Sequence, residues 1–454
     1  MSSRPELTTV QATRAAPSAA SRVRKVLRWA RRAWVPLALV AASLAMSISV
    51  TVQHSEQFSP LDEWVYYDYV VKIPTQFVVR QGEDISEPAL QAMACNGDSF
   101  GPRGEPCTGK DGVYDEPELY PQEGRTSADI YTPLYFAATW LMAQVVQFFT
   151  GLDLLVAARL TGFVWLASGV LALYAVAREL RIRKSVAFGL GMIVIGSVTS
   201  RYAYTYITTD APSFVMGAAL LLMTLRFLKS KSSGWWLVPL AALAVLFKVT
   251  NIFAVGLVAL ILLIHAIVRL RERPRLPGNP PSPGMILTVT SVMILASVGS
   301  EVVWLAIRSA IRVAPQPDQG LGVPLSKTGI AQQLATFLQF ETPSALDSAL
   351  MLPFGLLAIG GVVGLFLASE RWGFERSLSI ATAVAAIVFA PILLVAMNVV
   401  LGSSFPVISR YNASILPAFL LAIGLLARNR TSMTIVSLYG VGLVTVALVR
   451  GPTG

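Results

Sequence analysis

A few acidic and basic side chains stand where the long apolar runs of this sequence begin or end. They are Asp62, Glu63, Arg201, Asp210, Lys248 and Arg410, the last followed by Tyr411. Together such groups suit an anionic substrate, because Lys and Arg hold a phosphate and a carboxylate removes a proton from an attacking hydroxyl. A second carboxylate binds a divalent cation or orients a sugar hydroxyl. Taken singly, each of them is read more simply as a solvated loop charge.

The elements that position these residues are predicted to be membrane-spanning helices. Of the 454 residues, 54% are hydrophobic and 14% charged, against about 25% charged in an ordinary soluble domain. Apolar runs recur from Val35 almost to the C-terminus, and they are long enough to cross about 30 Å of hydrocarbon. The composition therefore predicts an all-α, polytopic membrane protein.

The net charge of +10 is distributed as topogenic charge and not as a nucleic-acid patch. Lys and Arg cluster in short segments between apolar runs, which marks those segments as cytoplasmic. Residues 53–131 instead carry 15 Asp or Glu against 5 Lys or Arg. We therefore predict a disordered, basic cytoplasmic tail over 1–34, a transmembrane domain over 35–450, and a large first extracytoplasmic loop over 53–131.

Parity of the basic clusters sets the number of crossings. Three apolar segments lie between Arg32 and Arg178, but an even number must cross. The segment 133–150 begins at a proline and carries two Gln residues, so we predict that it lies at the interface on the outer face. About eleven spanning helices then remain.

The same parity places Lys248 at an outward-facing turn. The apolar stretch 235–268 has 34 residues, about 51 Å as one helix, and both of its flanks are basic. The chain must therefore cross twice, and the segment Lys248-Val249-Thr250-Asn251 is its only polar interruption. A lysine near apolar surface needs a partner, either a carboxylate such as Asp210 or a bound phosphate; the simpler interpretation is a snorkelling side chain.

Both cysteines of the chain, Cys95 and Cys107, lie in the first outer loop. Two cysteines in one extracytoplasmic loop predict a disulfide that orders the loop. Two free thiols are the alternative.

Several short motifs resemble a known superfamily. Ser59-Pro60-Leu61-Asp62-Glu63-Trp64 resembles the acidic motif of the GT-C glycosyltransferases, which use polyprenyl-phosphate sugars. Tyr131-Thr132-Pro133-Leu134-Tyr135-Phe136 is similar to their His-Pro-Pro-Leu-Tyr segment, although the histidine is absent here. The resemblance is to bacterial, in particular actinobacterial, members.

Three further motifs follow in the order found in that superfamily. Thr208-Thr209-Asp210-Ala211-Pro212 resembles a Thr-Asp-Ala-Pro motif, and Phe247-Lys248-Val249-Thr250 resembles a Thr-Lys-Pro-Thr turn. Arg410-Tyr411, with Leu416-Pro417 after it, resembles an Arg-Tyr…Leu-Pro segment. The resemblance covers roughly residues 35 to 427 and implies a GT-C-like bundle with interfacial helices in the first outer loop.

The resemblance also implies an activity: inverting transfer of a sugar from a polyprenyl-phosphate donor to an acceptor on the extracytoplasmic face of a bacterial plasma membrane. Asp62 becomes the general base. The implied donor contacts are Glu63, Arg201, Asp210, Lys248, Arg410 and Tyr411, with Asp210 also a possible ligand for Mg or Mn. The acceptor stays open among an envelope glycan, a lipid and a protein.

Two other classes of protein compete with this prediction. A secondary transporter or a flippase for a lipid-linked or small polar substrate would use polar groups within the bilayer, for which Arg159, Glu301 and Asn398 are the candidates. A non-catalytic scaffold would give Asp62, Asp210 and Lys248 no common purpose. The sequence contains no Walker-type phosphate loop and no dinucleotide fingerprint, and its only histidines, His54 and His265, make a histidine zinc site implausible.

Overall fold

The computed structural model describes residues 19–450 except 54–55, 60–61, 99, 273–280, 316–321, 323, 340–343, 370–372, 402–403 and 406. Within these residues the chain is all-α, and the only β-type pairings are two isolated bridges. The α-helices are α1 (Ala19–Gln53), α2 (Glu63–Gln76), α3 (Glu87–Asn96), α4 (Pro133–Thr150), α5 (Leu154–Leu160), α6 (Gly162–Glu179), α7 (Lys184–Gly196), α8 (Val198–Thr205), α9 (Ser213–Leu228), α10 (Leu237–Phe247), α11 (Ile252–Glu272), α12 (Pro283–Ala310), α13 (Lys327–Gln332), α14 (Ala345–Ala368), α15 (Phe374–Leu401), α16 (Leu416–Leu426) and α17 (Arg430–Arg450). The short 3-10 helices are η1 (Pro117–Leu119), η2 (Pro121–Gly124), η3 (Ala128–Ile130), η4 (Gly234–Trp236), η5 (Val249–Asn251), η6 (Thr336–Leu338) and η7 (Ser409–Ser414).

The prediction of an all-α, polytopic membrane protein is confirmed. Seven helical segments of the described chain are long and apolar enough to cross a membrane, and the bent pair α7–α8 adds an eighth candidate. Three shorter apolar segments, 213–228, 234–247 and 416–426, bring the total to the predicted eleven only if each of them also crosses. The number of spans therefore stays a prediction.

The N-terminal region differs from the prediction in one respect. Helix α1 begins at Ala19, so its first turns extend through the basic cluster that we assigned to a disordered tail. Residues 1–18 of the predicted tail lie outside the described residues. The helix extends this far because the basic segment is rich in Ala and Arg, which are good helix formers.

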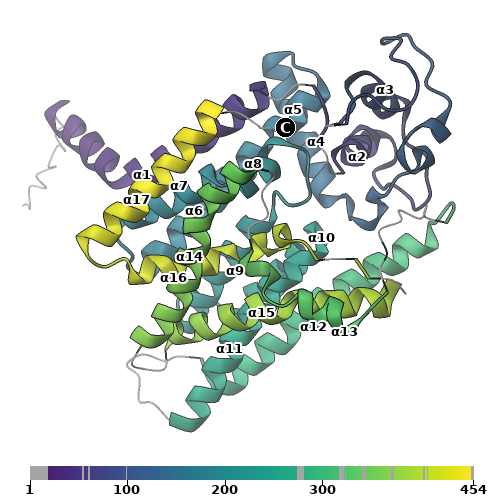
Figure 1. Ribbon diagram of the computed structural model, residues 1–454. Helices are drawn as coiled ribbons and strands as arrows, with labels where there is room; N and C mark the ends of the chain where they lie inside the picture. Colours follow the sequence, from purple (N-terminus) through teal and green to yellow (C-terminus); the bar gives the residue numbers. More distant parts are fainter. Residues whose placement is uncertain are drawn as a thin grey trace, which may run out of the picture.

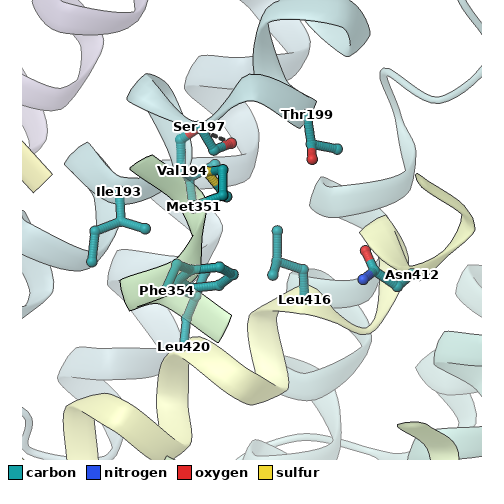
Figure 2. A pocket seen from close by; sticks show the side chains of 9 residues that line it. All are labelled: Ile193, Val194, Ser197, Thr199, Met351, Phe354, Asn412, Leu416 and Leu420. Carbon is teal, nitrogen blue, oxygen red and sulfur yellow. Dashed lines mark hydrogen bonds between the residues drawn. The ribbon is translucent and has the colours of Figure 1, made fainter. Parts of the chain in front are cut away.

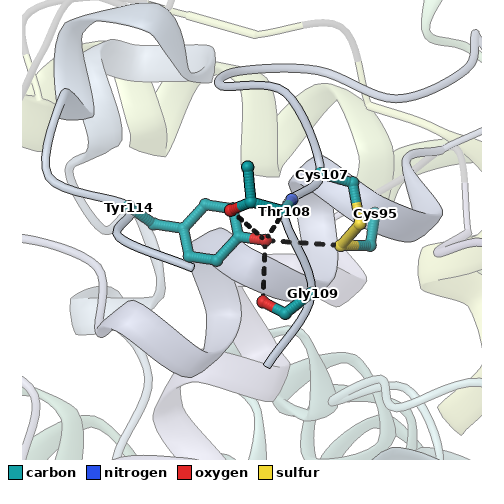
Figure 3. Close-up of a disulfide and its surroundings, with 5 residues drawn as sticks. All are labelled: Cys95, Cys107, Thr108, Gly109 and Tyr114. Atoms are coloured by element: carbon teal, nitrogen blue, oxygen red, sulfur yellow. Dashed lines mark hydrogen bonds between the residues drawn. A yellow bond between two sulfur atoms is a disulfide. The ribbon is translucent and has the colours of Figure 1, made fainter. Parts of the chain in front are cut away.

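Residues between α1 and α4 form a cap at one end of the helix bundle (Figure 1). The cap contains α2 and α3, and its second half is held by the predicted disulfide between Cys95 and Cys107. The Tyr114 hydroxyl lies beside this disulfide, where it accepts from the Thr108 backbone N–H and donates to the Gly109 carbonyl (Figure 3). The cysteine pairing is thus confirmed, and it orders a segment with little regular structure of its own.

The cap is attached to the bundle through α12. The Arg308 guanidinium binds the buried Asp129 carboxylate at 2.6 Å, and the Trp304 indole donates to the Ile130 carbonyl at 3.0 Å. Both cap residues belong to η3, directly before α4. The position of α4 relative to the bundle is therefore fixed at its first turn, and α4 itself has the predicted bounds 133–150.

Close helix packing joins α17, the last described helix, to α7 in the first half of the chain. Helix α17 packs along α7, where a Cβ atom on Gly440 would lie 2.4 Å from the Gly189 carbonyl oxygen. Small residues let membrane helices approach this closely, since lipid provides little hydrophobic driving force between them. This contact places the C-terminal end of α17 beside the bent pair.

Helix breaks at the cap end of the bundle position the polar residues. Helix α7 ends at Gly196, and α8 continues at an angle of 66° to it. Helix α10 ends at Phe247, where Lys248 adopts an extended backbone before η5 and α11. The predicted interruption of the apolar stretch at Lys248 is confirmed. Residues at a helix break are not held in the regular helical arrangement, so their side chains can point in other directions. These breaks therefore allow polar groups from different helices to come together.

Candidate functional site

Four charged side chains, one from the cap and three from the helix bundle, come together. We call Asp62, Asp210, Lys248 and Arg410 the charge cluster. The Lys248 ammonium forms an ion pair with the Asp210 carboxylate, and both side chains are buried. Arg410 bridges the two acids: its guanidinium lies 3.5 Å from Asp62 Oδ2 and 3.9 Å from Asp210 Oδ2. The structure thus brings together residues that lie up to 348 positions apart in the chain.

Tyr411 forms one wall of the charge cluster. Its ring centroid lies 5.2 Å from Lys248 Nζ and 5.8 Å from the Arg410 guanidinium carbon. An aromatic face attracts a cation through its quadrupole, so the Tyr411 ring stabilises both cations. The predicted position of Tyr411 at the site is consistent with this geometry.

Asp62 differs from Asp210 in its exposure. The side chain of Asp62 is 45% exposed, that of Asp210 only 9%. Asp62 Oδ2 is contacted by Arg410 and by the Tyr66 hydroxyl at 3.3 Å. Its Oδ1 has no hydrogen bond or ion pair with any described residue. One oxygen of this carboxylate is therefore held in place, and the other has no such contact within the described part of the chain.

A pair of tyrosine hydroxyls supports Asp62, and the sequence prediction missed it. The Tyr66 hydroxyl lies 3.1 Å from the Tyr131 hydroxyl. Since a phenol has one proton, Tyr66 accepts from Tyr131 when it donates to Asp62. Burial raises the pKa of both phenols, and the nearby acids and tyrosines raise it further, so both stay neutral donors. The signal available in the sequence was the position of the two tyrosines. Tyr66 follows the acidic motif, and Tyr131 precedes the start of α4.

The charge cluster is electrically balanced. It contains two carboxylates and two cations, all in direct or bridged contact. Burial by itself disfavours the Asp210 anion, but Lys248 and Arg410 outweigh this effect and hold the pKa of Asp210 below its usual value. Asp210 is therefore ionised at neutral pH, and Lys248 is not merely a snorkelling side chain.

The residues of the charge cluster fit a divalent cation poorly. Asp210 is already occupied by Lys248 and Arg410, and a metal would have to displace one of them. A divalent cation needs several oxygen ligands at one point, yet no group of three or more His, Cys, Asp or Glu side chains gathers in the described part of the chain. The expectation of Mg or Mn at Asp210 thus stays an untested prediction that these contacts do not favour.

Glu63, which the resemblance implies as a donor contact, is engaged in a separate buried ion pair. Its carboxylate faces Arg159, with Nε at 2.8 Å from Oε1 and an η nitrogen at 2.9 Å from Oε2. It also accepts from the backbone N–H groups of Ser59 at 2.8 Å and Ile207 at 2.9 Å. Both charged side chains are buried. Glu63 therefore joins the acidic motif, α5 and the loop before α9, and no oxygen of it is left for a substrate.

Arg201 also lies outside the charge cluster. Its guanidinium binds Asp347 at 2.7 Å, at the start of α14. Asp347 is fully buried, and the sequence had not marked it. The resemblance implies a donor contact for Arg201, but in the structure its guanidinium faces Asp347 of α14.

A small pocket lies between α7, α14, η7 and α16. It is lined by Ile193, Thr199, Met351, Phe354, Asn412 and Leu420, among others, and no charged side chain contributes to it (Figure 2). Asn412 follows Tyr411 directly in η7. The pocket and the charge cluster are therefore linked in sequence through η7.

No protein-family model matches the sequence, and no curated protein does. Among solved structures, the chain is similar to a crystal structure of the Archaeoglobus fulgidus oligosaccharyltransferase tethered with an acceptor peptide containing the NVT sequon via a disulfide bond. The sequence identity is 12% and the TM-score 0.47, and the match covers 94% of this chain and 56% of the archaeal chain. Since these values are low, any function for this chain has to rest on its own site residues.

Proposed function

We propose that this chain is a membrane glycosyltransferase of the GT-C type, which transfers a sugar from a polyprenyl-phosphate donor to an acceptor on the extracytoplasmic face. The observation that carries the proposal is the half-open carboxylate of Asp62, held at Oδ2 beside the cations Arg410 and Lys248. A base and a phosphate-binding pair within one cluster are what glycosyl transfer from a lipid phosphate requires.

In the proposed reaction, the acceptor hydroxyl approaches Asp62 Oδ1. The hydroxyl oxygen forms a bond to the anomeric carbon while its proton passes to Asp62. The bond between the anomeric carbon and the phosphate oxygen breaks, and the phosphate leaves with the electron pair. Arg410 and Lys248 stabilise the charge that develops on this phosphate. Direct displacement from the face opposite the leaving group inverts the anomeric configuration.

We further propose that the two cations perform the task of a metal ion. The donor phosphate would draw Arg410 or Lys248 partly away from the carboxylates, since each cation has an anionic partner before the donor binds. Pre-formed pairs keep these long side chains ordered, which lowers the entropic cost of donor binding. The transfer is then expected to proceed in the presence of a chelator.

The transporter or flippase alternative has weaker support. Of its three candidate residues, Arg159 is committed to Glu63. Glu301 belongs to α12 and Asn398 to α15. Neither side chain forms an ion pair or a hydrogen bond with another described residue. Unlike the residues of the charge cluster, these candidates do not form a group of contacting polar side chains.

The decisive experiment compares Asp62→Asn with Asp115→Asn in purified protein supplied with radiolabelled polyprenyl-phosphate sugars and an envelope fraction as acceptor. Asp115 is an exposed acid of the same loop and serves as the matched control. Asn keeps the shape of Asp62 but accepts no proton, so the rate should fall by about 10²–10⁴-fold while donor binding persists. Asp62→Asn activity within about threefold of wild type would remove Asp62 from this role. Transport of the labelled lipid without transfer would favour the alternative.

A further inference from the structure

A second group of charges lies at the cap end of the bundle, apart from the charge cluster. We call Arg201, Asp347 and Arg450 the second cluster. Arg201 approaches Asp347 Oδ1 at 2.7 Å, and Arg450 approaches the same oxygen at 3.4 Å. The other oxygen, Oδ2, accepts from the Ser344 hydroxyl at 2.8 Å. One buried carboxylate therefore faces two guanidinium groups.

Arg450 is the less well satisfied of the two cations. Its contact to Asp347 is long, and it has no other acidic partner among the described residues. Its side chain is 28% exposed, whereas Asp347 is fully buried. An arginine has five N–H donors, and one long contact uses few of them. Arg450 thus presents a positive charge and donors toward the surface.

The surface around the second cluster is apolar. Val449, next to Arg450, is 82% exposed, and Leu346, next to Asp347, is 50% exposed. Both belong to helices long and apolar enough to cross a membrane, so lipid is the environment that suits these exposed side chains. Val52 is 76% exposed in α1, whose last residue, Gln53, donates to the Leu448 carbonyl of α17. A partly exposed arginine at the end of such a surface stands at the depth of the lipid head groups.

From this arrangement we infer that Arg450, supported by the Arg201–Asp347 pair, binds the phosphate of an anionic membrane lipid. Arginine binds phosphate oxygens in a bidentate manner, and the apolar surface around it accommodates the lipid chains. The Arg201–Asp347 pair fixes the start of α14 against α8, so that Arg450 lies over a rigid base. This site is separate from the proposed sugar transfer and does not depend on it.

The experiment measures lipid binding by native mass spectrometry on the purified full chain in detergent. The probes are phosphatidylglycerol, a polyprenyl phosphate, inorganic phosphate and, as a zwitterionic control, phosphatidylcholine. The variant is Arg450→Gln, and the matched control is Arg430→Gln, an exposed arginine at the opposite end of the same helix. Arg450→Lys retains the charge and checks that a binding defect does not reflect misfolding.

Anionic lipid should bind the wild type and Arg430→Gln alike, and about tenfold more weakly to Arg450→Gln, which corresponds to about 1.4 kcal/mol. Binding of phosphatidylglycerol would identify a bulk anionic lipid as the ligand, and selective binding of polyprenyl phosphate would identify a carrier lipid; either supports the inference. Equal binding by Arg450→Gln and wild type would overturn it and leave Arg450 as a helix cap. Equal binding of phosphatidylcholine, or of inorganic phosphate alone, would also overturn it.

Discussion

The substitution Glu63→Gln tests whether the acidic motif is anchored through the buried pair of Glu63 and Arg159. The Glu63 carboxylate accepts four hydrogen bonds, two from Arg159 and one each from the Ser59 and Ile207 backbones. A glutamine side chain has a single acceptor oxygen, and its NH₂ group would face two of these donors. Two bonds are lost, and the Arg159 charge is left without its counter-charge.

The expected cost follows from the burial of the pair. The side chains are 2% and 0% exposed, and breaking a buried ion pair by removing one charge costs about 3–5 kcal/mol. Arg159 retains its bond to the Gln57 carbonyl at 2.7 Å, which places the estimate toward the lower value. This loss is large against a total stability of about 5–15 kcal/mol. The residue next to Glu63 in the chain is Asp62.

Equilibrium unfolding of purified protein in mixed detergent measures the effect. The matched control is Glu179→Gln, because Glu179 pairs at the surface with Lys229 and Lys231, where a pair contributes about 0–1 kcal/mol. The double variant Glu63→Leu with Arg159→Met replaces both charges by apolar groups and should recover much of the loss. If Glu63→Gln is no less stable than Glu179→Gln, the pair does not anchor the motif.

Three further outcomes are expected. Lys248→Met keeps the apolar stem but removes the charge that pairs with Asp210, so donor binding measured by titration should weaken about tenfold; unchanged affinity would leave Lys248 a structural residue. Since the pKa of Asp210 is lowered in the folded chain, its stabilisation is present above about pH 4, the unfolded value, and is lost as the pH falls through the folded value. Asp210→Asn should therefore flatten the acid side of the stability profile, and an unchanged profile would contradict this. Cys95→Ser opens a loop of sequence separation 12, and a loop of about this size contributes roughly 3 kcal/mol; proteolysis of the first loop should accelerate, and equal cleavage rates would speak against the disulfide's ordering role.

The sequence predicted those features of the fold that depend on local helix signals or on the parity of membrane crossings. Helix α4 has the predicted bounds 133–150 because Thr132 caps it by accepting from the Leu134 N–H and Gly151 ends it in a left-handed conformation. The break at Lys248 was predictable because a polar interruption in a long apolar stretch with basic flanks must be a turn. Such signals are local in the sequence.

The partners of buried charges were not predictable in the same way. Arg159 pairs with Glu63 across 96 positions, and Arg201 with Asp347 across 146. Which carboxylate meets which guanidinium depends on the crossing of helices and on the bend at α7–α8, and no residue spacing encodes either. Arg159 had stood out as a charge within an apolar run, but its partner could not be named.

Asp62 and Glu63 make different contacts because of their positions at the start of α2. Asp62 is the N-cap residue and Glu63 the first residue of the helix. Successive residues of an α-helix point about 100° apart, so two adjacent acids at a helix start cannot both face the same partner. Glu63 is turned inward to Arg159, and Asp62 is turned toward Arg410 and solvent. Because the inward acid fixes the helix start, the outward acid gains a fixed position without being buried. The proposed reaction needs an Asp62 carboxylate that is both held and accessible, and this arrangement provides both.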